Sequence, residues 1–185
     1  MDYTKFDVSM HSDQSRSLRK LHLGGVPKSE LLRQLAAHGV QLNPLADQLF
    51  LETGYAISAV PTTMAVVISP VAALGLEQGG TFSQIADRAH LLAWSLCPLE
   101  LGPHLRLQFL DQAEGFLGQP YTKNCAPPGS VTVASLPISE DDQVPKGFYL
   151  RVIQGVPWLR GYRSWSGHVW APSDMFAFIV NDGVA

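Results

Sequence analysis

A carboxylate and an imidazole lie one after the other in the chain at Glu100 and His104, with Leu-Gly-Pro between them. Such a pair can exchange protons in general acid–base catalysis, and Arg106 could hold an anionic substrate beside it. Gly102 and Pro103 indicate a turn, so the two side chains are not expected to share one face of a helix. Glu100 and His104 are therefore candidate catalytic residues, and the alternative is a loop histidine beside a structural carboxylate.

A second set of side chains that could bind a ligand comes from two strand-like runs on either side of Gln154-Gly155. This dipeptide predicts a two-residue β-hairpin loop, and the loop fixes the register of the two strands. One face of the hairpin is then apolar and should meet the core. The other face gathers four aromatic and guanidinium side chains, Tyr149, Arg151, Trp158 and Arg160.

Arginines beside aromatic rings can stack on bases, hold anions or bind an acidic partner. The alternative is structural, because Arg151 over Trp158 and Arg160 over Tyr149 would be cation–π pairs that stabilise the hairpin. Pro157 cannot donate to a strand ladder, which predicts that the second strand lies at the sheet edge. A Gly/Ser-rich segment continues the aromatic and basic character with Arg163, Trp165, His168 and Trp170.

Motifs for metals and cofactors are absent from the sequence. The six histidines are scattered, and no HxH, HExxH or CxxC spacing occurs, so neither a metal site nor a cofactor is expected. Gly24-Gly25 and Gly79-Gly80 lack the lysine of a phosphate-binding loop. Cys97 and Cys125 are expected to be reduced thiols.

The composition bounds the class of protein. The 185 residues are 46% hydrophobic and 16% charged, with a formal net charge of −3. This balance predicts a folded chain and gives no basic footprint for nucleic acid. The longest uncharged stretch, residues 53–76, is interrupted by Pro61 and Pro70, so no membrane span is expected. The N-terminus lacks the apolar segment of a signal peptide, and we expect a cytoplasmic protein.

Residues 1–20 are polar and aperiodic, which predicts a flexible tail. The remainder, residues 21–185, is expected to form a single α+β domain with a helical portion over residues 21–56. Two helices are predicted there, one beginning at Pro27 and ending at His38-Gly39, and one capped by Asn43. A third helix begins with a capping box of Thr81 and Gln84, keeps an apolar 3.6-residue period to Leu96 and is stopped by Pro98.

Beyond the third helix the apolar period changes to two, which is typical of strands. Helices followed by strands predict an α+β fold in which the capped helix packs on a mostly antiparallel sheet of about five strands, within residues 57–185. The predicted strands cover residues 105–109, 131–134, 148–152 and 176–180, with residues 64–68 as a buried strand before the helix.

The run LCPLELGPHLRLQFLDQ at residues 96–112, with GFYLR at 147–151 and WLRGY at 158–162, resembles a domain found in many bacterial proteins without assigned function. The resemblance covers about residues 70–182. It implies a compact bacterial cytoplasmic domain, and it assigns no role to any residue.

The leading hypothesis is a non-catalytic binding or interaction module. Its surface would be the Tyr149/Arg151/Trp158/Arg160 face, with Arg106 adjacent, and its partner would be a protein or a small anionic ligand. The alternative is a small hydrolase or transferase acting on an anionic substrate, with Glu100, His104 and Arg106 at the mouth of its pocket.

Overall fold

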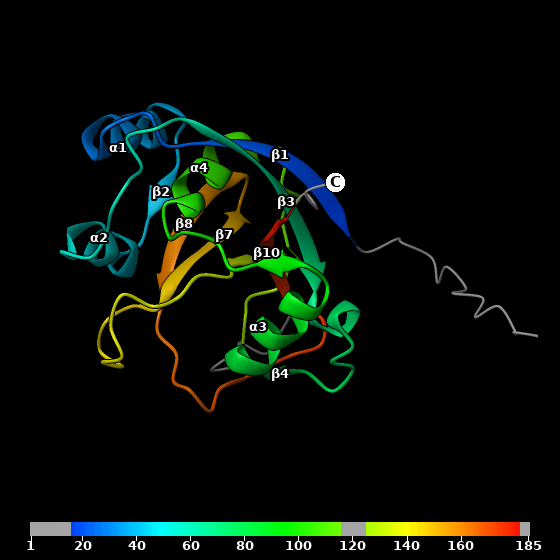
Figure 1. Cartoon of the computed structure of the whole chain (residues 1–185). Helices are drawn as coiled ribbons and strands as arrows, with labels where there is room; N and C mark the ends of the chain where they lie inside the picture. The colour runs from blue at the N-terminus through cyan, green and yellow to red at the C-terminus, as the bar shows by residue number, and fades with distance from the viewer. Residues whose placement is uncertain (1–15, 116–124, 182–185) are drawn as a thin grey trace, which may run out of the picture.

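The computed structural model describes residues 16–115 and 125–181 and combines α-helices with a mixed, mostly antiparallel sheet (Figure 1). Within these residues the main sheet has eight strands in the order β1-β3-β10-β6-β7-β8-β2, with β5 also paired to β10. The β10–β6 and β2–β8 pairs are parallel, and the other pairs are antiparallel. The predicted α+β class is confirmed, whereas the expected number of about five strands was too small.

The strands of the main sheet are β1 (Ser17–Leu23), β2 (Gln41–Leu42), β3 (Thr62–Pro70), β5 (Trp94–Ser95), β6 (Val131–Val133), β7 (Gly147–Ile153), β8 (Val156–Tyr162) and β10 (Met175–Val180). Two short strands, β4 (Gly80–Thr81) and β9 (Val169–Trp170), form a separate antiparallel pair. The helices are α1 (Lys28–Ala37), α2 (Pro44–Leu51), the 3-10 helix η1 (Val71–Leu74), α3 (Phe82–Leu91) and α4 (Leu101–Gln108).

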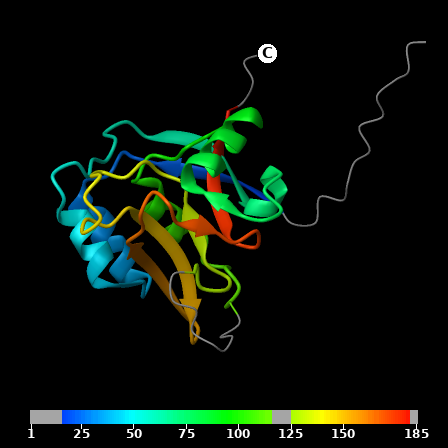
Figure 2. The ribbon, with the colours of Figure 1, turned by 90° about the horizontal axis from the view of Figure 1, so that it is seen from below.

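Helices cover the sheet on both faces, which gives two hydrophobic clusters. The first cluster packs α1, α2 and α4 on one face, with Leu35, Leu49 and Leu105 among its buried residues. The second packs η1 and α3 on the other face through Leu74 and Ile85. Figure 2 shows the blue helices α1 and α2 on one side of the orange β7–β8 hairpin and the green segment of η1 and α3 on the other.

The predicted helix starts are confirmed. Pro27 precedes α1, the Asn43 side chain accepts from the backbone N–H of Ala46 at the start of α2, and Thr81 forms a reciprocal capping box with Gln84 at the start of α3. These signals are local, because a cap only needs to satisfy backbone N–H groups within the first turn of its own helix.

The prediction of a tail over residues 1–20 was wrong from Ser17 onward, and residues 1–15 lie outside the described residues. Strand β1 pairs along its whole length with β3, and Leu21 and Leu23 are buried in the first cluster. Two buried leucines among polar neighbours are too short a pattern to indicate a strand, and the strand forms because β3 offers it an edge.

Helix α3 also ends earlier than predicted, at Leu91 rather than near Pro98. Ala93 has a positive φ of 58°, which reverses the chain, and Trp94 then begins the short strand β5 beside β10. The Trp94 ring packs on Phe178 with their centroids 5.7 Å apart. The apolar period continues past the helix because β5 buries its side chains against the same cluster as α3 does.

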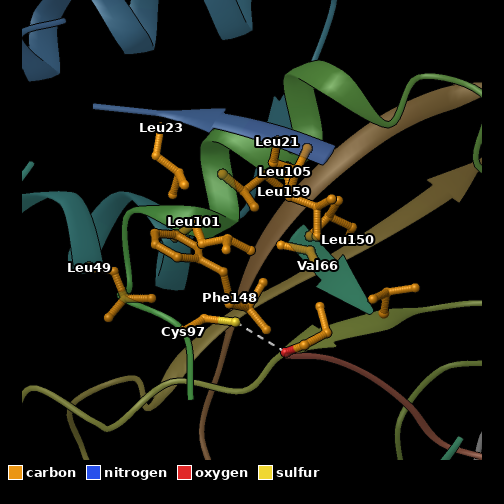
Figure 3. Close-up of a cluster of buried hydrophobic side chains, with 14 of the residues drawn as sticks. Leu21, Leu23, Leu49, Val66, Cys97, Leu101, Leu105, Phe148, Leu150 and Leu159 are labelled. Carbon is orange, nitrogen blue, oxygen red and sulfur yellow. Dashed lines mark hydrogen bonds between the residues drawn. The ribbon is translucent and has the colours of Figure 1, made fainter. Parts of the chain in front are cut away.

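The predicted strand over residues 105–109 was wrong, because Leu101–Gln108 forms helix α4. Pro103 lies in its first turn, where a proline is tolerated since the N–H that it lacks would have no partner within the helix. Leu101 and Leu105 then point to the core together with Phe148 (Figure 3). Gly102 permits this packing, because a Cβ atom there would lie 2.8 Å from the Phe148 ring.

The β7–β8 hairpin has the predicted register. Ile153 pairs with Val156, Arg151 with Trp158 and Tyr149 with Arg160. Both turn residues have positive φ, 50° at Gln154 and 73° at Gly155, as a tight hairpin turn requires.

The prediction that β8 forms the sheet edge was wrong, because β2 pairs with Trp158 and Leu159. Pro157 lies just before this pairing begins, where its missing N–H removes no bond to β2.

Candidate functional site

The candidate catalytic pair lies at the start of α4. Glu100 immediately precedes the helix and His104 follows one turn later, so the two residues have the helical spacing that the turn signal seemed to exclude. Both side chains are buried. A Glu100 carboxylate oxygen accepts from the Ser58 N–H at 3.0 Å, and His104 Nε2 accepts from the Gly24 N–H at 3.2 Å.

These hydrogen bonds hold two loops against α4. Burial lowers the pKa of His104, which favours the neutral imidazole whose lone pair the Gly24 N–H occupies. A neighbouring pocket of about 410 Å³ is lined by the supported loops, including Ser58 and Tyr55, but not by Glu100 or His104. The geometry therefore gives both residues a structural task.

Arg106 points away from this pair. Its side chain is fully buried, donating 2.6 Å from Nη1 to Gln112 Oε1 and from Nη2 to the Phe109 carbonyl. Gln112 in turn donates to the carbonyl oxygens of Gly129 and Leu150. Burial lowers the pKa of Arg106 to about 10. The expectation that Arg106 adds to an exposed binding face was wrong, because it joins α4 to β7 inside the fold.

The predicted aromatic and guanidinium face is only partly accessible. Arg151 is buried at 7% exposure, and Tyr149, Trp158 and Arg160 are half-buried. Arg160 Nε donates to the Tyr149 hydroxyl at 2.8 Å, and the Arg160 guanidinium lies 5.0 Å from the Trp158 ring centroid. In the described part of the chain, Arg160 rather than Arg151 makes the cation–π contact with Trp158. This arrangement supports the hairpin itself.

The same face of the hairpin continues into a larger cleft. Two adjoining hollows of about 530 and 170 Å³ share four lining residues, Tyr162, Ser164, Trp165 and Trp170. We call the two hollows together the aromatic cleft. Tyr149 lines the smaller hollow, so the cleft touches the predicted hairpin surface at one residue. The larger hollow extends between the loop before β7 and helix α3, which lie with segment 163–168 in the lower part of Figure 1.

A chain of ring contacts fixes the wall of the aromatic cleft. Trp170 is buried and meets Phe176 of the second cluster at 4.9 Å and Tyr162 at 5.6 Å between ring centroids. His168 packs between Trp170 and Trp165, at 4.7 and 5.1 Å. Trp165 ends this chain with 49% of its surface exposed. A rigid aromatic stack therefore presents one open indole.

Strands β4 and β9 set the position of Trp170. Gly80 pairs with Trp170, and the preceding Gly79 has a φ of 81°. A Cβ atom at Gly79 would lie 2.2 Å from the Trp170 carbonyl oxygen. Gly79 thus allows the backbone of β4 to approach the backbone of β9 closely, and this packing explains the Gly79-Gly80 pair without a phosphate site.

The polar wall of the larger hollow carries an unusual hydroxyl. Ser135 is 2% exposed, lines this hollow, and its Oγ has no hydrogen-bond partner among the described residues. Buried polar atoms are nearly always paired, so this hydroxyl keeps a hydrogen-bonding capacity that a water molecule or a ligand in the hollow would satisfy. Burial also raises the pKa of Tyr162, so its phenol stays protonated.

The charges around the larger hollow are mostly negative. Lys146 has its ammonium group fixed by the Ser139 and Asp141 carbonyls, at 3.0 and 3.1 Å, and by Asp142 at 3.5 Å. Asp87 and Glu140 also line the hollow, and within residues 16–115 and 125–181 neither has an ion-pair partner. Their carboxylates are left to interact with a ligand.

Some residues of the aromatic cleft were predicted from the sequence to belong to a binding surface. The aromatic segment with Trp165, His168 and Trp170 was identified as a continuation of the hairpin surface. Ser135, Asp87, Glu140 and Asp142 had no signal in the sequence, because a serine shortly after a strand and charges in a helix and a loop are ordinary. Only the fold brings these separate segments together.

The described residues contain no group of three or more metal-binding side chains, and none of their helices could cross a membrane. Cys97 and Cys125 are both free. The chain matches no protein-family model, no curated protein and no solved structure. The resemblance to a bacterial domain family therefore stays a prediction, and function has to be argued from the geometry.

Proposed function

We propose that the chain is a non-catalytic binding module whose ligand occupies the aromatic cleft. The observation that carries the proposal is the buried, unpaired hydroxyl of Ser135 in a hollow that also presents the open face of Trp165. Leaving a buried hydroxyl unpaired costs about 1–3 kcal/mol, which a hydrogen bond from a ligand would offset. An accessible indole on a rigid support supplies apolar contact area.

The Tyr149/Arg151/Trp158/Arg160 face has a smaller part in this proposal than the sequence suggested. Arg160 donates from Nε to the Tyr149 hydroxyl and its guanidinium lies over the Trp158 ring, whereas Arg151 is buried. Tyr149 is the member of this set that lines the cleft. The hairpin thus supports the cleft. The principal contacts with the ligand come from residues 162–170, from α3 and from the loop before β7.

The alternative function, a hydrolase or transferase for an anionic substrate, requires Glu100, His104 and Arg106 to surround one substrate. Glu100 and His104 instead accept hydrogen bonds from backbone N–H groups, and Arg106 donates toward Phe109 and Gln112. This separation favours the binding module.

A ligand screen tests the proposal. Thermal unfolding of the full chain would be followed with nucleotides, sugars, phosphorylated metabolites and short peptides of either charge. A ligand at a hundredfold excess over its Kd stabilises the folded state by about 2.7 kcal/mol. We expect at least one such shift, and we expect Trp165→Ala to abolish it.

Leu51→Ala is the matched control, because Leu51 is an exposed apolar residue on α2, in the opposite layer. It should leave the shift intact. A cooperatively melting protein that no compound stabilises, or a shift that survives Trp165→Ala, would contradict the proposal.

A further inference from the structure

The chemistry of the aromatic cleft selects among the possible ligands. The larger hollow is lined by three residues with carboxylates, Asp87, Glu140 and Asp142, and by one with an ammonium group, Lys146. Lys146 is already bound by Asp142 and by two carbonyl oxygens. The hollow therefore has excess negative charge, and it disfavours the anionic ligand expected from the hairpin arginines.

The aromatic wall adds a second preference. A planar guanidinium stacks on an indole face and can donate several hydrogen bonds at once, whereas an ammonium is a compact, strongly hydrated charge. Trp165 offers the open indole, and the Ser135 oxygen offers an acceptor without a partner. The carboxylates and the Ser135 oxygen can accept hydrogen bonds from the N–H edges of a guanidinium, and the indole can stack on its planar face.

The rim of the cleft indicates a ligand larger than a free amino acid. Leu136, which lines the larger hollow, is 68% exposed. With Trp165 it adds exposed apolar surface to the lining of a charged hollow. Protein interfaces commonly combine an anchor side chain with apolar contacts around it.

We infer that the larger hollow binds an arginine side chain in an extended segment of a partner protein, with the guanidinium stacked on Trp165 and paired with Asp87 and Glu140. This inference rests on the proposed binding function. The inference goes beyond the proposed function because it states the charge and the class of the ligand.

Fluorescence anisotropy with labelled peptides tests the inference on the full chain. The probe is a peptide with blocked termini whose one charged residue is a central arginine flanked by leucines, and its matched partner carries citrulline, which keeps the shape and removes the charge. We expect the arginine peptide to bind at least about tenfold more tightly, since charged hydrogen bonds are about twice as strong as neutral ones. Its affinity should fall as salt is added.

Variants of the protein locate the binding. Asp87→Asn combined with Glu140→Gln should lower the affinity for the arginine peptide about tenfold and leave the citrulline peptide unchanged. Asp47→Asn, an exposed carboxylate on α2 in the opposite layer, is the control and should change neither affinity. Circular dichroism confirms that each variant is folded.

Four outcomes distinguish a failure of this inference from a failure of the proposed binding function. Equal binding of the arginine and citrulline peptides would overturn the inference, as would arginine binding that survives the double substitution. If an acidic peptide or a nucleotide binds in a manner that depends on Trp165 while the arginine peptide does not, the binding module stands and the inference fails. If no probe depends on Trp165, both fail.

Discussion

The Nε2 atom of His104 accepts a hydrogen bond from the backbone N–H of Gly24, which lies just after strand β1. An imidazole can accept at this nitrogen only while the nitrogen is unprotonated. The contact therefore links the protonation state of one buried side chain to the position of the loop between β1 and α1.

This link predicts a pH-dependent stability. Burial lowers the pKa of His104 in the folded state, whereas in the unfolded state this pKa is about 6.5. As the pH falls below that value, the unfolded chain binds a proton that the folded chain does not bind. The free energy of unfolding should therefore decrease until the pH passes the folded pKa. Urea denaturation at neutral and mildly acidic pH measures the decrease.

Two substitutions make the test specific. His104→Gln can keep an acceptor for the Gly24 N–H without titrating, so it should reduce the pH dependence. His104→Leu removes the acceptor and should cost about 1–3 kcal/mol at neutral pH. Some dependence will remain, because burial also lowers the pKa of His168. If the free energy of unfolding of His104→Gln depends on pH as strongly as that of the original protein, His104 is not the source of the pH dependence.

A second prediction concerns the first turn of α4. A Cβ atom at Gly102 would lie 2.8 Å from the Phe148 ring, and Phe148 is fully buried. Gly102→Ala should therefore lower the free energy of unfolding by about 1–3 kcal/mol, the usual cost of overpacking. Gly39→Ala is the contrasting variant, since nothing lies within 4 Å of its Cβ position and its strain comes only from a φ of 69°.

Combining Gly102→Ala with a smaller residue at position 148 checks the cause. The double variant Gly102→Ala/Phe148→Leu should cost less than the sum of the two single variants, because the added methyl group then has space. Additive costs would place the effect of Gly102→Ala elsewhere than in the contact with Phe148.

Local patterns predicted the parts of the fold that depend on local interactions. The turn residues Gln154 and Gly155 and the alternation around them were sufficient to give the hairpin its full register. The Thr81–Gln84 capping box likewise depends on a single helical turn. In both cases the required partners lie within a few residues along the chain.

Helix α4 shows why other parts could not be predicted. Leu105, Leu107 and Phe109 alternate as in a strand, and Gly102-Pro103 indicates a turn. The helix forms because Phe148, distant in sequence, packs against it and Arg106 finds partners inside the fold. Tertiary contacts of this kind override short-range propensity. The aromatic cleft is the same case, since Ser135 and Asp87 belong to different segments.

A third prediction follows from Arg106. Its guanidinium joins α4 to Gln112, whose amide reaches the Leu150 carbonyl on β7. Arg106→Met removes the donors and leaves the Gln112 oxygen and the Phe109 carbonyl without this partner. We expect the free energy of unfolding to fall by about 1.5–3 kcal/mol, as for hydrogen bonds to charged groups.

The matched variant for this prediction is Arg106→Met/Gln112→Leu, which removes both ends of the contact. The Gln112 amide also donates to the Gly129 and Leu150 carbonyls, so Gln112→Leu alone should lower the free energy of unfolding as well. The double variant should cost less than the sum of the two single variants, because the contact between residues 106 and 112 is then lost only once. Chemical denaturation measures all three variants. A surface role for Arg106 would instead predict little change in stability from Arg106→Met.

The last prediction separates the functional from the structural reading of Ser135. If its buried hydroxyl exists for a ligand, it weakens the free protein and strengthens the complex. Ser135→Ala removes the unpaired group and keeps nearly the same volume. The free energy of unfolding of the ligand-free protein should therefore stay the same or rise by up to about 1 kcal/mol, and the melting temperature should follow it. The affinity for the arginine peptide should fall several-fold.

Ser69→Ala provides the comparison, because Ser69 is a fully buried serine on β3 that lines neither hollow and donates to the Pro70 carbonyl. It should leave arginine-peptide affinity unchanged. A loss of stability in Ser135→Ala would mean that its hydroxyl already has a partner in the free protein. Opposite changes in stability and affinity are expected only where a protein keeps an unpaired polar group in order to bind.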